Sequence, residues 1–507
     1  MKKIILIIIL LIFSINIYSN IAVFPFYVEN SDNKIPNEWL SEAMFYCLPI
    51  NLEQNGFNTT PYMDVKSMLY TNNINYPYRF TKATLIKIAS NYNIDYVLWG
   101  KIEYSNDKLL ISPVIIKIKT LKQQYLPIYR GKLKSLFGII KKIINYTTFY
   151  FKKDKLNNLD FYIDYHYYEM FIKSLVIKNP TNSLKVLKIV HENYPNTNAI
   201  NFEIARRYFE TNNFNKSIQY LEKAQNDTIF LNKVSFLLGL NYYNKNEFDK
   251  SMKYFEKTSN IKKYREASLN NIALIYINQN DNEKAKKILF NLYDISHDPI
   301  ILHNLIILFF KTNNSNYIEE FLEKVINFLR YYPQNNEFSK FFQYIVESEN
   351  NKEIEDIFKE YLEDYQNSEN DYNYILINPF SLRKIFAKPK QININIKKTL
   401  KRIKKTDNTD ILIEKYEDLI QENPFIWEYH TILSNLYIKK KKFSKAERSI
   451  KASLFLNKNE LNYKTILNLY YLINNFEDLK IYYYEFRRSY PESKLLKKYE
   501  KFIVNNK

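Results

Sequence analysis

Hydrophobic and small residues repeat in a fixed pattern along the middle of the chain. A small residue recurs every 34 residues, and a tyrosine, a second small residue and a bulky apolar residue follow it at constant distances. These positions are Ala205, Gly239 and Ala273, then Tyr208, Tyr242 and Tyr276, then Ser217, Ser251 and Ala285, then Leu221, Phe255 and Leu289. A period of this length is typical of stacked supersecondary units. We therefore expect helical hairpins that bury their apolar faces against their neighbours.

The spacing resembles that of the tetratricopeptide repeat, a unit of two antiparallel helices. In that family two small residues let the helices approach closely, and a proline near the end stops the second helix. The clearest units are 198–231, 232–265, 266–299 and 427–460, and the same period adds 164–197, 300–333, 334–367, 393–426 and 461–494. We expect a first block of repeats over 164–367, a linker over 368–392 and a second block over 393–494. Unrelated amphipathic helices are the alternative.

Before the repeats, residues 20–153 have the mixed pattern of a small α/β domain. We expect a strand over Ile21–Val28, helices that begin near Asn37, Asp64 and Thr81, strands over Asp95–Ser105 and Lys108–Lys119, and a helix over Leu133–Ile144. Asn106 and Asp107 lie between the two later strands and are favoured in a tight hairpin turn. The predicted fold class is therefore α+β and multidomain, with a small sheet domain followed by an all-α solenoid.

Three motifs of this first domain occur in a particular order. They are F-P-F at Phe24–Phe26 with Asn30 after it, W-L-x-E-A at Trp39–Ala43, and D-Y-V-L-x-G at Asp95–Gly100. Together they resemble the amino-terminal domain of TolB and its relatives, which include accessory proteins of the bacterial cell envelope. The resemblance implies a non-catalytic module that docks other envelope proteins.

The first 19 residues have the pattern of a secretory signal peptide. Met1-Lys2-Lys3 is cationic and Ile4–Phe13 is apolar. The apolar run is shorter than the roughly 20 residues that cross a bilayer, so we expect cleavage, with a retained membrane anchor as the alternative. The protein is then exported, and periplasmic or associated with the envelope. Cys47 is the only cysteine, so no disulfide forms within the chain.

The sequence offers no recognisable catalytic, metal or cofactor site. The five histidines are scattered, no H-E-x-x-H occurs, and cysteine pairs are lacking. Neither a G-x-G-x-x-G loop nor a G-x-S-x-G elbow is present. We therefore expect no enzyme, no cofactor, no metal and no small-molecule substrate. An envelope enzyme with an unrecognised site is the alternative.

Positive charge is the strongest bias of the composition, with a formal net charge of +19. Two stretches, 108–153 and 372–406, contain lysine and arginine but no acid. The second includes a candidate basic patch of Lys397, Lys398, Lys401 and Arg402. Such patches favour anionic partners such as lipid headgroups or acidic glycans, and export argues against nucleic acid. A merely solvated lysine-rich face is the alternative.

The best candidate site is the groove that the first helices of the repeats would line. By resemblance to the repeat family, the groove residues are Phe202, Arg206, Phe209, Phe236, Leu240 and Tyr243. An aromatic lining with one guanidinium suits an apolar peptide or helix. Asn270 and Asn304 occupy the position of Phe202 and Phe236 in later repeats, which argues against a clamp for a C-terminal carboxylate. These aromatic residues could instead pack between repeats or against the first domain.

The sequence thus predicts an exported, non-enzymatic scaffold that binds a protein or peptide partner in the bacterial cell envelope through its repeats. A membrane-anchored sensor is the rival interpretation.

Overall fold

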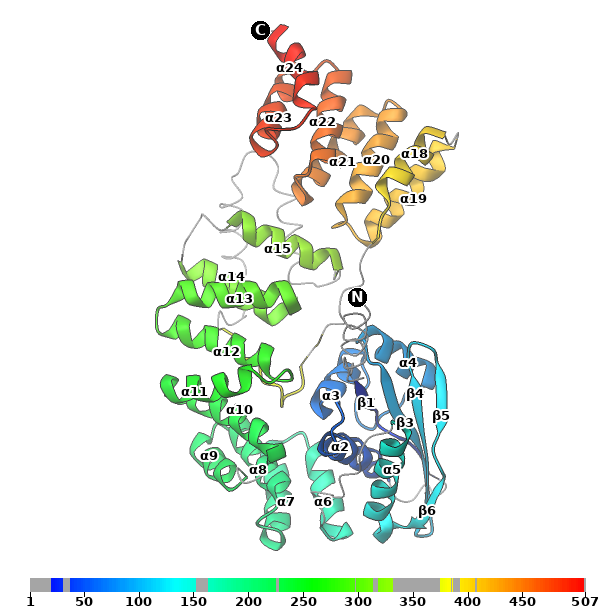
Figure 1. The fold of residues 1–507 in the computed structure, drawn as a ribbon, viewed down its shortest axis with the longest axis vertical. Coiled ribbons are helices and arrows are strands. Elements are labelled where there is room, and N and C mark those ends of the chain that lie inside the picture. Colours follow the sequence, from blue (N-terminus) through cyan, green and yellow to red (C-terminus); the bar gives the residue numbers. More distant parts are fainter. Residues whose placement is uncertain are drawn as a thin grey trace, which may run out of the picture. The chain divides into compact units, whose positions relative to one another are not determined.

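The computed structural model describes residues 20–30, 37–151, 163–224, 228–296, 298–312, 318–331, 374–383, 385, 393–405 and 408–505. The chain forms two units (Figure 1). Unit 1 comprises Met1–Leu308 and Tyr374–Lys388, and unit 2 comprises Phe309–Asn373 and Pro389–Lys507. The expected signal peptide 1–19 and the expected repeat 334–367 lie outside the described residues. The expected linker 368–392 differs from the structure where it is described, because residues 374–383 are part of unit 1.

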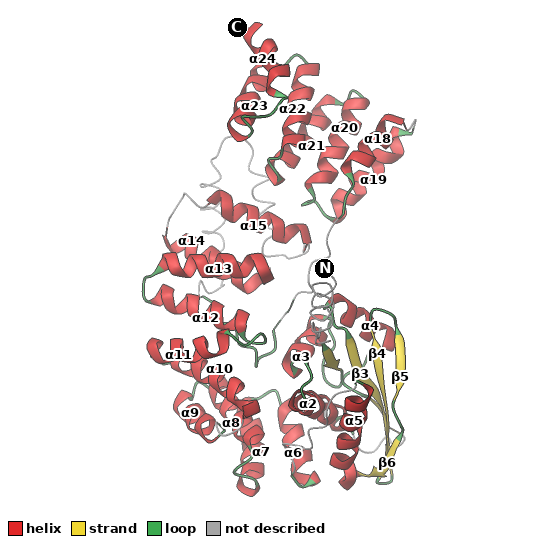
Figure 2. Ribbon diagram, viewed as in Figure 1, coloured by secondary structure: helices red, strands yellow, loops and turns green. Residues whose placement is uncertain are grey.

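Unit 1 begins with a sheet whose two longest strands form a hairpin (Figure 2). The described strands are β1 (Ile21–Val23), β2 (Tyr27–Asn30), β3 (Tyr96–Ser105), β4 (Lys108–Lys117), β5 (Lys122–Tyr125) and β6 (Tyr129–Lys132). Strands β1 and β2 pair in parallel with successive parts of β3. Strand β4 runs antiparallel to β3 and pairs on its other side with β5 and β6. The expected turn at Asn106–Asp107 is confirmed, with both residues at positive φ.

The strand expected over Ile21–Val28 is two strands instead of one. Phe24-Pro25-Phe26 separates β1 from β2, because Pro25 has no N–H to donate to the ladder. Phe24 still donates its N–H to the carbonyl of Leu98 over 3.0 Å. A Cβ at Gly100 would lie 2.6 Å from the ring of Phe26, so this close approach requires glycine.

Four helices complete the α/β domain: α2 (Trp39–Gln54), α3 (Tyr62–Thr71), α4 (Lys82–Asn91) and α5 (Leu136–Tyr150). Thr81 caps α4, since its side chain accepts the N–H of Thr84. The helix expected over Leu133–Ile144 begins as a 3₁₀ turn and continues to Tyr150. One hydrophobic core contains residues from all of these elements except α5. It includes Phe24 just after β1, Phe45 of α2, Leu69 of α3, Leu85 of α4 and Val97 of β3. The sheet is thus covered by helices brought together from distant parts of the sequence.

Helical hairpins follow the α/β domain within unit 1. They are α6 (Tyr165–Val176) with α7 (Pro180–Asn193), α8 (Asn198–Glu210) with α9 (Phe214–Lys223), α10 (Thr228–Asn244) with α11 (Phe248–Ser259), and α12 (Arg265–Asn278) with α13 (Asn282–Ser296), and α14 (Pro299–Thr312) follows them. The expected period is confirmed, because each hairpin occupies one predicted repeat. Asn212, Asn246 and Asn280 adopt positive φ in the turns inside three hairpins, a conformation that asparagine tolerates better than most residues.

The predicted small positions do lie at close helix contacts. A Cβ at Gly239 on α10 would lie 2.7 Å from the ring of Phe255 on α11. The hydroxyl of Ser251 donates to the carbonyl of Gly239 over 2.8 Å. Ala205, Ala273 and Ala285 are fully buried. The repeat pattern therefore marks the contacts within each hairpin.

Unit 2 contains the second block of hairpins. Its described helices are α15 (Ile318–Tyr331), α18 (Ile396–Lys405), α19 (Thr409–Glu422), α20 (Trp427–Lys439), α21 (Phe443–Leu456), α22 (Glu460–Leu472), α23 (Phe476–Ser489) and α24 (Leu496–Asn505). An ion pair between Arg330 and Glu428 joins α15 to α20. Helix α24 lies beyond the expected end of the second block at residue 494. In the part of the chain that the structure describes, no helix is long and apolar enough to cross a membrane.

Candidate functional site

The first helices of the hairpins in unit 1 form a surface that holds another part of the same chain. We call it the helix-A face and define it by α8, α10, α12 and α14. Residues 374–383, which we call the groove segment, run along this face (Figure 1). The segment is extended up to Asn378 and then turns, because the side chain of Asn378 accepts the N–H of Phe380 over 2.9 Å. The hydrogen bonds from asparagine side chains to this segment join residues that are 71 to 106 positions apart in the sequence.

Two asparagines hold the backbone of the groove segment. The amide of Asn304 accepts the N–H of Ile375 over 2.8 Å and donates to the carbonyl of the same residue over 2.9 Å. Asn271 does the same to Ile377, over 2.9 and 3.1 Å. Each side chain thus pairs with both polar groups of one residue, as a neighbouring β-strand would. Such contacts recognise an extended backbone whatever its side chains are.

A third asparagine connects this pair. Asn270 donates to the carbonyl of Ile375 over 3.2 Å and to the side chain of Asn271 over 3.1 Å, and it accepts from Asn304 over 2.9 Å. All three asparagines are fully buried. Leaving a buried amide without a partner costs about 1–3 kcal/mol. The groove segment therefore supplies the hydrogen-bond partners that these amides need while they are buried.

Next to the asparagines an aromatic cup receives Phe380. Its ring lies 5.2 Å from that of Phe202, 5.8 Å from that of Phe236 and 6.2 Å from that of Tyr264. The first two contacts are edge-to-face, an arrangement that aromatic pairs favour. Phe380 and Ile377 are both buried, whereas the side chain of Ile375 is 41% exposed. The segment is thus anchored by two side chains and by its backbone.

The structure brings together only part of the predicted groove. Phe202 and Phe236 lie in the cup, and Leu240 is fully buried. Phe209 contacts Phe214 of its own hairpin, and the hydroxyl of Tyr243 accepts from Asn278. Sequence reasoning noticed Asn270 and Asn304 but missed Asn271 and the groove segment. The alternation of Ile375 and Ile377 before Pro379 was the only local signal of an extended segment.

The groove segment continues from the helix-A face to the α/β domain. The N–H of Arg383 donates to Ser67 on α3 over 3.4 Å. The N–H of Ile385 donates to Thr71, also on α3, over 3.1 Å, and Tyr92 donates to the carbonyl of Ile385 over 2.9 Å. The segment therefore connects the repeats to the α/β domain inside unit 1.

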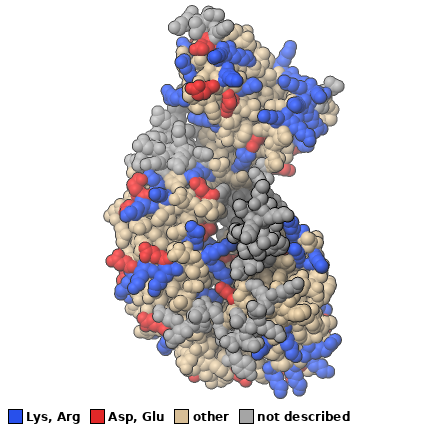
Figure 3. All heavy atoms as spheres, viewed as in Figure 1, with Lys and Arg blue, Asp and Glu red and all other residues tan. Residues whose placement is uncertain are grey.

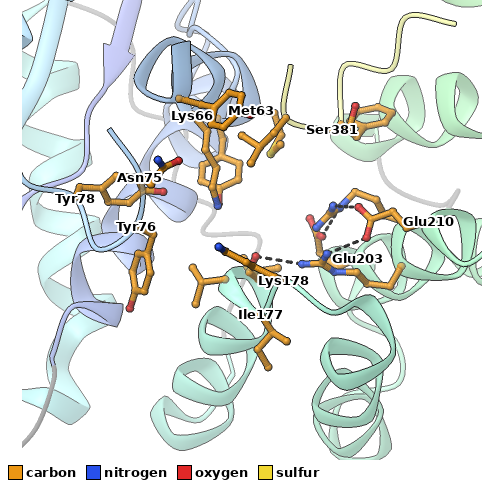
Figure 4. Close-up of a pocket in the computed structure, with 18 of the residues that line it drawn as sticks. Met63, Lys66, Asn75, Tyr76, Tyr78, Ile177, Lys178, Glu203, Glu210 and Ser381 are labelled. Atoms are coloured by element: carbon orange, nitrogen blue, oxygen red, sulfur yellow. Dashed lines mark hydrogen bonds and ion pairs between the residues drawn. The ribbon is translucent and has the colours of Figure 1, made fainter. Parts of the chain in front are cut away.

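A pocket of about 520 Å³ lies beside the segment. Tyr76 and Tyr78 of the α/β domain line one side, and Glu203 and Glu210 of α8 line the other (Figure 4). Phe380, Ser381 and Leu382 of the groove segment form part of its wall. The groove segment thus contributes both to the contacts on the helix-A face and to the wall of the pocket.

Ion pairs fix the charged groups of this pocket. Arg206, a predicted groove residue, pairs with Glu203 over 2.8 Å and with Glu210, while Arg207 pairs with Glu210 over 2.8 Å. Burial opposes the charge of Arg206, but the carboxylates of Glu203 and Glu210 outweigh it and raise the pKa of the guanidinium. Lys66 pairs with the buried Glu42 over 2.9 Å. These ion pairs balance the charges of Arg206, Arg207 and Lys66, and Lys178 is a further cation that lines the pocket.

The described residues contain no group of three or more His, Cys, Asp or Glu side chains that could hold a metal ion. The thiol of Cys47 is buried, and burial raises its pKa to about 12. It therefore stays protonated near neutral pH and is a poor nucleophile.

The predicted basic patch lies on α18 in unit 2. Lys397, Lys398, Lys401 and Arg402 are all exposed there, and Figure 3 shows basic side chains gathered over this helix. Its opposite side is apolar, because Ile403 belongs to the core of unit 2 and Leu400 packs against that core. The patch and the helix-A face thus belong to different units.

The comparisons with known proteins define a class for the hairpins. A family model of the tetratricopeptide repeat matches residues 233–263 and 266–289, which cover most of α10, all of α11, nearly all of α12 and the first half of α13. Proteins with such repeats generally bind protein or peptide partners and are generally not enzymes. The matched hairpins are therefore of the tetratricopeptide type, a fold that suggests a protein-interaction scaffold.

Among solved structures, the chain is similar to PilF of Pseudomonas aeruginosa at 15% identity, with 35% of this chain and 81% of that chain covered and a TM-score of 0.28. It is also similar to the apo form of the quorum sensor NprR from B. thuringiensis, at 13% identity over 63% and 82% of the two chains, with a TM-score of 0.32. MamA matches at 12% identity over 41% and 99%, with a TM-score of 0.24. Values this low carry no argument about function. No curated protein matches the chain.

Proposed function

We propose that this protein is an exported, non-enzymatic scaffold of the bacterial cell envelope, which binds an extended segment of a partner protein on its helix-A face. One observation carries the proposal: Asn271 and Asn304 each pair with both backbone groups of one residue in an extended chain. A surface of this kind suits a peptide better than a folded domain.

The envelope setting is supported by the sequence. A cationic start followed by an apolar run favours export. The order of motifs in the first domain resembles the amino-terminal domain of TolB, and in that family this module docks other envelope proteins. The repeats and the first domain would then act together as one scaffold.

The test is photo-crosslinking in the cell from a probe at Phe209, which is at the helix-A face but only half-buried. A matched probe at Tyr484 on α23 is 51% exposed and lies in unit 2. We expect one partner band from the first position and none from the second. The double variant Asn271→Ala/Asn304→Ala should lose that band. A band that is unchanged in the folded double variant would contradict the proposal.

A further inference from the structure

The groove segment packs on unit 1 but does not form part of any of its helical hairpins. The groove segment belongs to unit 1, whereas the nearest described helices before and after it in the sequence, α15 and α18, belong to unit 2. No hairpin of unit 1 needs them for its own helices, since α8 to α13 each have their partner helix. What they supply is hydrogen-bond partners for three buried asparagines and a ring for the aromatic cup.

The contacts define what else could lie there. At Ile375 the helix-A face hydrogen-bonds to the backbone alone, because that side chain is substantially exposed. At Ile377 the helix-A face hydrogen-bonds to the backbone, and the side chain is buried. At Phe380, three residues later, the aromatic cup packs against an aromatic ring. A segment that is extended at its apolar residue and then turns, as the chain does at Asn378–Phe380, meets the same requirements if an aromatic residue follows at this spacing.

We propose that residues 374–383 are a displaceable internal ligand of the helix-A face, and that the partner segment which replaces them is extended up to an apolar residue and then turns, with an aromatic residue three positions after the apolar one. This inference rests on the proposed function, because it names the partner of the same face. When no partner is bound, the internal segment satisfies the buried asparagines.

Displacement would change more than the helix-A face. Phe380, Ser381 and Leu382 also line the pocket, and Ile385 is bound to Thr71 and Tyr92 of the α/β domain. Removing the segment from the asparagines therefore opens one wall of the pocket and loosens its attachment to α3 and α4. Partner capture by the repeats is in this way coupled to the surface of the α/β domain.

The experiment measures binding of a fluorescent peptide with the sequence of residues 374–383 to the full chain. A tethered segment competes at an effective concentration in the millimolar range, so the unmodified protein should bind the peptide weakly. Phe380→Ala weakens only the internal competitor. Because a buried aromatic anchor is commonly a hot spot, this variant should bind the peptide at least about 10-fold more tightly.

Peptide variants test the recognition mode on the Phe380→Ala protein. Methylation of the backbone nitrogen of Ile377 removes the donor to Asn271 and should abolish binding. Replacement of Ile375 by alanine in the peptide is the matched control and should change binding by less than about 3-fold, since single exposed positions contribute little. Replacement of the peptide phenylalanine by alanine should weaken binding at least about 10-fold.

Ile385→Ala provides a second route if Phe380→Ala does not fold. It removes the packing of the Ile385 side chain against the core of the α/β domain without altering the helix-A face, and it should also raise the affinity for the peptide. Equal affinities of the unmodified protein and both folded variants would overturn the internal-ligand proposal. If the peptide bound all three proteins equally but no longer bound after Asn271→Ala/Asn304→Ala, the internal-ligand proposal would fail and the proposed function would still hold. If the variants did bind the peptide more tightly but the probe at Phe209 captured no partner in the cell, the proposed function would be overturned instead.

Discussion

Asparagine has two separate roles at the scale of single residues. Asn212, Asn246 and Asn280 form turns at positive φ, a local role that depends only on neighbours in the chain. Asn271 and Asn304 instead hold a segment that is distant in sequence. The first role follows from the spacing of the repeat. The second could not be predicted from the residues alone, because the same side chain serves in both.

Phe236 shows why an aromatic residue is an ambiguous site marker. It packs against Phe255 and Tyr264 of the repeats as well as against Phe380 of the groove segment. Both sequence interpretations, a groove lining and packing between repeats, thus describe part of its surroundings. Its truncation would damage the repeats, so binding tests should use the asparagines.

Glu266 at the start of α12 should make the stability of unit 1 depend on pH. Burial, followed by the nearby Asp298, raises the pKa of Glu266 from 4.5 to about 7, while Arg383 opposes the shift. Since the folded state holds this proton more tightly than the unfolded state does, the free energy of unfolding should fall as the pH rises from about 4.5 to about 7. Glu266→Gln should flatten this part of the profile, measured as melting temperature against pH.

The control for this prediction is Glu283→Gln on α13, where the glutamate side chain is 74% exposed and pairs with Lys286. It should leave the profile unchanged. The pKa of Asp64 is also raised by burial, so a smaller slope of the same sign should remain in Glu266→Gln. A Glu266→Gln profile identical to that of the unmodified protein would show that this carboxyl does not hold its proton on folding.

At the scale of elements, local patterns predicted most of what the structure contains. The 34-residue period located the hairpins of unit 1, and Asn106–Asp107 located the turn between β3 and β4. Prediction failed where the secondary structure depends on a long-range contact or on a single backbone group. Pro25 divides the first strand, and the groove segment is extended because side chains about 70 to 100 positions away hold it.

The hairpin of α10 and α11 should not accept a larger residue at its closest contact. A Cβ at Gly239 would lie 2.7 Å from Phe255, so Gly239→Leu must push the two helices apart. Overpacking of this kind costs about 1–3 kcal/mol, which a lower melting temperature would reveal. Gly138→Ala on α5 is the matched control, because its Cβ would meet nothing within 4 Å. It should leave stability equal or raise it by up to about 1 kcal/mol.

At the scale of the whole molecule, the two units have different surfaces. Unit 1 contains the sheet domain, the helix-A face and the pocket, whereas unit 2 contains the basic helix α18. The composition could predict that basic helix, since it is local in sequence. It could not predict that residues 374–383, inside the same basic stretch, belong to the other unit.

The N-terminal end of unit 1 bears on the prediction of export. The N–H of Asn20 donates to the carboxylate of Asp95 over 2.8 Å, and Ile21 begins β1. Cleavage just before Asn20 would place a new ammonium group on that carboxylate and leave β1 intact. N-terminal sequencing of protein from the envelope fraction should therefore start near Asn20. Recovery of intact Lys2-Lys3 in that fraction would favour the membrane-anchored sensor.

Partner capture should depend on the helix-A face of unit 1 more than on the basic patch of unit 2. Exposed lysines mainly tune association rate and salt dependence, whereas loss of Asn271 and Asn304 removes the backbone contacts themselves. In a pull-down at low and high salt, a triple alanine variant of Lys397, Lys398 and Lys401 should keep the partner. Asn271→Ala/Asn304→Ala should lose it at both salts. The reverse result would place the site on α18 and make an anionic partner the leading hypothesis, since only charge pairing at that helix would then explain capture.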